Sequence, residues 1–280
     1  MHIMPTFLPD EDFRARRRVL LQSDFAYAPK PEPPPSDMID EVTWREIVTL
    51  PDDVAVRTSN FHGTTIKKLA DLWGVWIECC DLRRDFMNDV MLDSTDDFQC
   101  AQYLALTGFY RNSIAAVRSA VELITIGTWA QACRKRQEFS DWRTRKAPLS
   151  LSIACDGLIA GAAPLRKHLA STVNDSLFDQ KTPLGEGGFV RRSFSGISEF
   201  SHGRPGFTDG DIRRSNGPIY VRSAFEHAAW IQFEMFGLAF VLLLIARPGS
   251  QMPPAVVDLF ADANKVKSRV TRAAFEFLHP

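Results

Sequence analysis

Apolar residues recur at intervals of three and four along most of the chain after Asn60, and this spacing is typical of amphipathic helices. The interval is clear in Ile66, Leu69 and Trp73, and it continues as far as Met91. We therefore expect one long helix of about thirty residues in this part of the chain. The strict apolar–polar alternation that indicates strands is negligible. The pattern predicts an all-α protein.

Capping and turn residues divide the remaining apolar runs into helices. The run Ser94-Thr95-Asp96-Asp97 predicts a helix start, because small oxygen-bearing and acidic side chains satisfy the free N–H groups of a first turn. Gly203 and Pro205 predict that a helix ends just before them. The basic stretch 134–146 is expected to be a loop or a frayed helix end. The expected helices are 95–109, 110–132, 149–173, 189–201, 223–246 and 254–277.

The first sixty residues differ from the rest of the chain. Phe13–Leu21 could form a short basic helix, whereas Lys30–Pro35 is a polyproline-like spacer that cannot be helical. The 280 residues are 45% apolar, which is enough to build a large core. We expect an N-terminal arm with a Pro-rich linker at 1–58 and a helical bundle domain at 59–280.

Composition narrows the setting of the protein. A formal net charge of −1 removes any argument from net charge for nucleic-acid binding. Five cysteines without a C-x-x-C pair indicate reduced core residues of a cytoplasmic protein, with a vicinal redox pair at Cys79 and Cys80 as the alternative. The chain start lacks the pattern of a signal peptide. The most apolar window, Ile231–Ala246, is shorter than the ~20 residues that cross a bilayer and contains Glu234, so a core helix rather than a membrane span is expected.

Charged residues interrupt the apolar helix expected at 110–132. Arg111, Arg118 and Glu122 lie among Ile, Val, Ala and Leu, and an unpaired ion in an apolar interior costs several kcal/mol. Arg118 and Glu122, one helical turn apart, must therefore pair with each other or with a polar cluster from elsewhere. Glu199 and His202 can supply such a cluster, because residues three apart share one helix face. The alternative for His202 is a charged residue that caps the end of its helix.

Motifs of several enzyme classes are missing from the sequence. There is no phosphate-binding G-x-x-x-x-G-K-[ST], no G-x-G-x-x-G after a strand, no H-E-x-x-H and no G-x-S-x-G. The six histidines are scattered, and no pair has the i,i+4 spacing of metal ligands on a helix. We therefore expect neither a metal site nor a cofactor.

Three segments carry a resemblance to a known group of proteins. They are Arg111–Glu122 (RNSIAAVRSAVE), Phe194–Phe207 (FSGISEFSHGRPGF) and Ser215–Val221 (SNGPIYV). The chain from Thr95 to Ala246 resembles bacterial all-helical proteins related to the HEPN superfamily, which includes abortive-infection and toxin-like members. The resemblance implies an elaborated antiparallel helical bundle that forms a homodimer.

The resemblance also implies a catalytic pair. Many HEPN proteins are metal-independent ribonucleases of toxin–antitoxin or anti-phage systems, marked by an arginine and a histidine at the start of a long helix. Arg222 and His227 match this signature, with four residues between them. The imidazole would exchange a proton with a ribose hydroxyl, and the guanidinium would stabilise charge on the phosphate. Ser223 departs from the pattern, because active members usually have an amide or an acid directly after the arginine.

Two functions of different classes follow. The first is a HEPN-like ribonuclease that cuts RNA with Arg222 and His227, supported by a polar cluster. The second is a non-catalytic helical protein of a defence system that dimerises or binds a partner protein, in which the same charges form a structural network. Convergence of the pair in an open basic cleft would favour the enzyme. The supporting cluster in both cases is Arg111, Arg118, Glu122, Glu199 and His202.

Overall fold

The computed structural model of the chain describes residues 39–80, 85–181, 185, 187–201 and 217–279. These residues are predominantly helical and contain no β-strand, so the prediction of an all-α protein is confirmed. The chain divides into two compact units, residues 1–44 and 45–280, and the expected domain boundary at residue 58 falls within a helix of the second unit. The first unit contains the short helix α2 (Glu41–Trp44). The predicted basic helix 13–21 and the Pro-rich spacer 30–35 lie outside the described residues.

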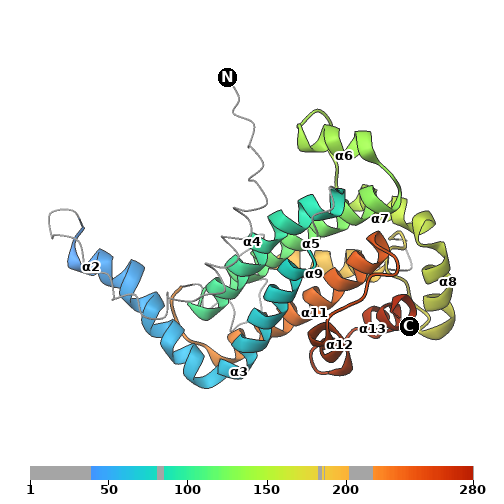
Figure 1. Cartoon of the computed structure of the whole chain (residues 1–280). Helices are drawn as coiled ribbons and strands as arrows, with labels where there is room; N and C mark the ends of the chain where they lie inside the picture. Colours follow the sequence, from blue (N-terminus) through green and yellow to red (C-terminus); the bar gives the residue numbers. More distant parts are fainter. Residues whose placement is uncertain (1–38, 81–84, 182–184, 186, 202–216, 280) are drawn as a thin grey trace. The chain divides into compact units, whose positions relative to one another are not determined.

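The second unit is a bundle built around two long helices, α5 and α11 (Figure 1). Helix α5 packs against α4, α7, α9 and α11, which makes it the central helix of the bundle. Along the chain, the second unit begins with a short π-helical turn and continues as α-helices. The elements are η2 (Arg45–Thr49), α3 (Leu50–Glu78), α4 (Phe86–Leu106), α5 (Tyr110–Ala132), α6 (Arg136–Arg143), α7 (Leu151–Gly161), α8 (Ala163–Thr172), α9 (Phe189–Ser201), α11 (Arg222–Ala246), α12 (Pro254–Ala261) and α13 (Arg269–Leu278).

Helix α11 forms the apolar centre of the core. It is long and apolar enough to cross a membrane, yet 94% of its most apolar window is buried inside the structure. Phe236 stacks on Phe98 with 4.1 Å between ring centroids, and Phe240 meets the edge of Trp76. Burying one such side chain stabilises the fold by about 1.5–3 kcal/mol. The apolar window beginning at Ile231 is therefore a core helix in this structure, as expected.

The single long helix expected from 60 to 91 is wrong, because the chain breaks between α3 and α4. Asp85 begins α4 by accepting a hydrogen bond from the backbone N–H of Asn88 at 2.7 Å. Arg247, after the end of α11, donates to both carboxylate oxygens of Asp85 at 2.8 and 3.0 Å, and to the carbonyl of Cys79 at 3.1 Å. The break is thus stabilised by a residue distant in sequence.

The helix start expected at Ser94–Asp97 is also wrong, since these residues lie inside α4. Ser94 is fully buried, and its hydroxyl donates to the carbonyl of Met91 while accepting a hydrogen bond from Nε1 of Trp76. Thr95 donates to the same carbonyl at 2.8 Å. Serine and threonine can remain within a helix when their hydroxyls bond back to the preceding turn.

Other expected helices match the structure more closely. The bounds of α5 and α9 agree with the prediction, and α11 begins one residue earlier, at Arg222. The helices expected at 149–173 and 254–277 are each two helices, and a short helix, α6, lies in the stretch expected to be a loop or a frayed end. Helix α8 begins anew because Pro164 is favoured in a first turn and disfavoured in a helix interior.

Candidate functional site

Helix α9 separates two grooves on the surface of the bundle. The first, the α9–α11 groove, has a volume of about 560 Å³ and is mostly apolar. The second, the α5–α9 groove, has a volume of about 700 Å³ and is rich in serine and charged side chains. Gly196 and Glu199 of α9 line both. Helix α9 takes this place because Val190 and Ile197 are buried on its inner face, where it packs against α5.

Arg118 ties α5 to α9 beside the α5–α9 groove. Its Nε donates to the hydroxyl of Ser198 at 2.8 Å, and its guanidinium lies 4.4 Å from the ring centroid of Phe194. The expected ion pair with Glu122 is present at 3.8 Å, between side chains that are 28% and 33% exposed. Such a half-exposed pair contributes little by itself, about 1 kcal/mol or less. The cluster around Arg118 therefore links α5 and α9, and its charged side chains are more exposed to solvent than the sequence predicted.

The other members of the expected cluster lie near the end of α9. Arg111 donates from Nε to the backbone carbonyl of Phe200 at 2.5 Å, and a cation there complements the negative end of the helix dipole. Glu199 is exposed on α9 and lines both grooves. His202, together with the predicted stop signals Gly203 and Pro205, lies outside the described residues.

Arg222 and His227 occupy the first two turns of α11. Five residues along a helix correspond to about 140° of rotation, so the two side chains leave the helix in different directions. Arg222 is 76% exposed and forms an ion pair with Glu226 at 2.8 Å. His227 is half-buried and lines the α9–α11 groove, whereas Arg222 is not among the described residues that line it. Their catalytic role stays a prediction.

Aromatic side chains surround His227 in the α9–α11 groove. Its ring lies edge-on to Phe200, with 6.0 Å between centroids, and to Trp230, with 5.8 Å. The ammonium of Lys267 lies 4.5 Å from the ring centroid of Trp230, a cation–π contact. The Nε1 atom of Trp230 is buried and has no hydrogen-bond partner among the residues that the structure describes. The α9–α11 groove thus has a mostly apolar wall and a few polar groups.

Glu234 is the buried acid of this groove, with only 5% of its surface exposed. Its carboxylate accepts hydrogen bonds from the backbone N–H groups of Lys267 at 2.8 Å and Ser268 at 3.1 Å. Burial raises the pKa of Glu234, and these N–H groups oppose that change. Sequence reasoning used Glu234 only against a membrane span. A buried acid needs donors, so its position in an apolar run was also a signal for a polar partner.

A cluster of His62, Tyr220 and Phe225, which the sequence did not predict, lies near Arg222. Within α3 the backbone is kinked at His62, whose Nε2 lies 3.0 Å from the hydroxyl of Tyr220. The His62 ring packs 4.4 Å from that of Phe225. Burial lowers the pKa of His62, Glu226 opposes this change, and Arg222 adds to it. Nothing in the local sequence joins residue 62 to residue 220, so only the fold reveals the contact.

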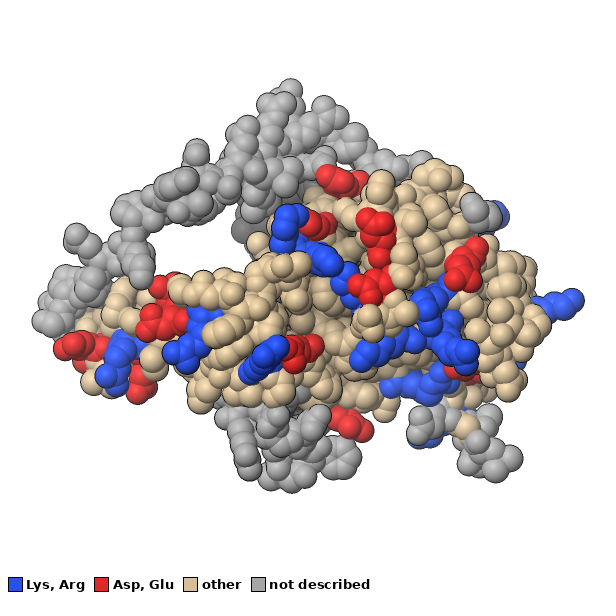
Figure 2. Space-filling view, turned by 90° about the horizontal axis from the view of Figure 1, so that it is seen from below, with Lys and Arg blue, Asp and Glu red and all other residues tan. Residues whose placement is uncertain are grey.

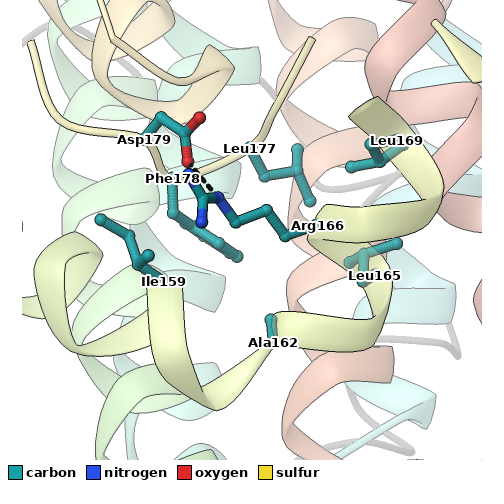
Figure 3. Close-up of a pocket in the computed structure, with 8 residues that line it drawn as sticks. All are labelled: Ile159, Ala162, Leu165, Arg166, Leu169, Leu177, Phe178 and Asp179. Atoms are coloured by element: carbon teal, nitrogen blue, oxygen red, sulfur yellow. Dashed lines mark hydrogen bonds and ion pairs between the residues drawn. The ribbon is translucent and has the colours of Figure 1, made fainter. Parts of the chain in front are cut away.

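The cysteines and the smallest cavity offer no further chemistry. Burial raises the pKa of Cys79 to about 11 and that of Cys80 to about 12, which makes their thiolates scarce and disfavours the redox pair. In the described part of the chain, no group of His, Cys, Asp and Glu could hold a metal ion. Figure 3 shows a cavity at the corner of α7 and α8, beside the Arg166–Asp179 ion pair. Its volume of about 10 Å³ suits at most one water.

Comparisons of the chain with protein-family models, with curated proteins and with solved structures find no match. The fold class and the geometry of the grooves therefore stand on the structure itself. The relation to HEPN proteins stays a prediction from the three sequence segments.

Proposed function

We propose that this protein is a non-catalytic binding protein whose α9–α11 groove holds a small, mostly apolar ligand. The observation that carries the proposal is the groove itself, about 560 Å³ in volume and lined mainly by aromatic and aliphatic side chains. Ligand sites of proteins measure about 300–1,000 Å³ and combine such walls with a few polar groups. Among the lining residues are Phe189, Ile197, Phe200, Trp230, Ile231 and Met235.

Two observations favour binding over RNA cleavage. Arg222 is held in an ion pair with Glu226, and it is not among the described residues that line the α9–α11 groove with His227. On the face seen in Figure 2, Lys and Arg form one larger group to the right of centre and smaller groups elsewhere, and Asp and Glu lie beside them. A phosphate backbone is attracted by a basic stripe, and intermixed charges attract it weakly.

Gly196 allows a direct test of the groove. A Cβ atom at this position would meet nothing within 4 Å, so the first atom of a side chain can be added there without a clash. We expect the neutral fluorescent probe N-phenyl-1-naphthylamine to bind wild-type protein saturably. Gly196→Trp should abolish this binding by filling the groove. Gly196→Ala, the matched control, should keep it while stabilising α9 by about 1 kcal/mol. Probe binding that survives Gly196→Trp, or that is missing from the wild type, would contradict the proposal.

The HEPN-like ribonuclease is the second candidate. It is favoured by the start of α11 at Arg222, which places Arg222 and His227 in the first two turns of a long helix. The test is cleavage of mixed single-stranded RNA in EDTA by the wild type, Arg222→Ala and His227→Ala, with Arg57→Ala and His168→Ala as controls. Cleavage lost in the first two variants and kept in the controls would replace the binding proposal with the enzyme.

Three further proposals follow, the first two from the resemblance and the third from the cysteine pattern. They are a homodimer, a partner protein in a bacterial defence or toxin-type system, and a cytoplasmic location. Sedimentation equilibrium of the purified chain tests the first, with a mass of twice 31.5 kDa expected. A monomer at all concentrations would remove the dimer from the proposal.

A further inference from the structure

The α9–α11 groove carries its polar groups on different elements. Glu199 is the exposed acid on α9, and Lys267 lies in the segment just before α13. The remaining acid, Glu234, is buried, and its carboxylate is already occupied by two backbone N–H groups. Among the described lining residues, Lys267 is the lysine that a ligand would meet, whereas the acids are Glu199 on α9 and the hydrogen-bonded Glu234.

Lys267 is available to a ligand. Its side chain is exposed, and its only described contact is the one with the Trp230 ring at 4.5 Å. No described carboxylate forms an ion pair with its ammonium, although the charge of Lys267 lowers the pKa of Glu234 from a distance. An ammonium held over an aromatic ring keeps its other donors for a further acceptor.

Trp230 supplies a second donor beside the first. Its Nε1 atom is buried and lacks a hydrogen-bond partner in the described part of the chain, although buried polar groups in native proteins are nearly always paired. The ring of Trp230 also lines the groove and lies against His227. A buried donor and an ammonium that have no hydrogen-bond or ion-pair partner among the described residues suit a ligand that brings an anionic acceptor.

We propose that the ligand of the α9–α11 groove is an amphipathic anion, an apolar body with one carboxylate-like end held by Lys267 and the indole N–H of Trp230. The inference rests on the proposed function and makes it more specific. The apolar body lies along the aromatic and aliphatic wall, where burial drives its binding. The anionic end lies at Lys267, whose ammonium offsets the charge of the Glu234 carboxylate bonded to the Lys267 backbone.

The test is a competition experiment with three amphiphiles of equal chain length and different end groups. Dodecanoate, 1-dodecanol and dodecyltrimethylammonium, each below its micellar concentration, are titrated against protein loaded with N-phenyl-1-naphthylamine. We expect dodecanoate to displace the probe at a concentration about tenfold lower than the other two, as a charge-assisted hydrogen bond would give. Equal displacement by all three would overturn the proposed ligand class and leave the binding groove intact.

Variants assign the preference to its residues. Lys267→Met keeps the apolar stem and should remove most of the preference for dodecanoate, while the binding of dodecanol stays unchanged. Trp230→Phe keeps a ring and removes the N–H group, and should weaken dodecanoate selectively by a few-fold. The control is Lys135→Met, which removes a lysine paired with Glu138 near α6 and should have no effect. An undiminished preference in Lys267→Met overturns the proposal even if Trp230→Phe fails to fold. Failure of the probe itself to bind would instead overturn the proposed function.

Discussion

The two ends of α11 each carry an arginine, and the two residues differ in exposure and in the range of their contacts. Arg222 at the start is 76% exposed and pairs with Glu226 one turn away. Arg247 beyond the end is 8% exposed and bonds through two nitrogens to Asp85, which lies far away in the sequence. Arg222 therefore makes a local contact within α11, whereas Arg247 connects the end of α11 to the end of α3 and the start of α4. Position in the fold, rather than residue type, decides whether an arginine stabilises the structure.

Arg247→Ala should have the largest effect on this comparison. It would leave the Asp85 carboxylate, whose side chain is 16% exposed, without its arginine and the carbonyl of Cys79 without the donor described here. We expect the free energy of unfolding to fall by about 3–5 kcal/mol, as for other broken buried pairs. Urea denaturation measures it. Arg247→Lys should recover only part of the loss, because one ammonium cannot replace a bidentate guanidinium. A loss below about 1 kcal/mol would mean that the pair behaves like a surface pair.

His62 provides a pH-dependent effect of intermediate size near the start of α11. Burial lowers its pKa below the ordinary value of 6.5, so the folded state favours the neutral ring. This contribution to stability is complete above pH 6.5 and is lost as pH falls through the lowered pKa. The measurement is urea denaturation from pH 8 to pH 5 of the wild type and of His62→Gln, which cannot titrate there.

The difference in the free energy of unfolding between the wild type and His62→Gln isolates the contribution of His62. Several carboxyls act in the opposite direction, above all Asp97, whose pKa is raised to about 6 by burial and by Asp96 and Asp93. Wild type should lose stability relative to His62→Gln as the pH falls. Parallel pH profiles would show that His62 titrates alike in the folded and unfolded chains.

Arg222→Ala should have the smallest effect on stability. Its side chain is solvent-exposed, and the ion pair with Glu226 is screened by water. We expect a denaturation midpoint that cannot be distinguished from that of the wild type, with Glu226→Gln as the matched variant. A clear destabilisation by Arg222→Ala would mean that both ends of α11 are anchored by their arginines.

Local signals in the sequence sufficed for the helices whose ends depend on nearby residues. The bounds of α5 and α9 and the core position of α11 follow from apolar spacing and composition. The break before α4 was missed because Asp85 is fixed by Arg247, and no local pattern joins residues so far apart. Ser94 was misread because a serine hydroxyl can cap a helix or bond back within one.

The candidate site was less accessible from the sequence than the fold. The pairing of Arg118 with Glu122 follows from their i,i+4 spacing and is present. The neighbours that define the α9–α11 groove, Trp230 and Lys267, come together only when the segment before α13 packs beside α11. The contact of His62 with Tyr220 is likewise tertiary. Apolar periodicity indicates which face of a helix is buried. It carries no information on which side chains of other elements pack against that face.

Helix α9 is a partition between two chambers, since Gly196 and Glu199 belong to the lining of both grooves. A partition cannot shift towards one chamber without receding from the other. Occupancy of the apolar side that displaces α9 would therefore alter the affinity of the polar side, and thermodynamic reciprocity requires the same factor in reverse. Two occupants, one in each groove, would then be coupled through a single helix of thirteen residues.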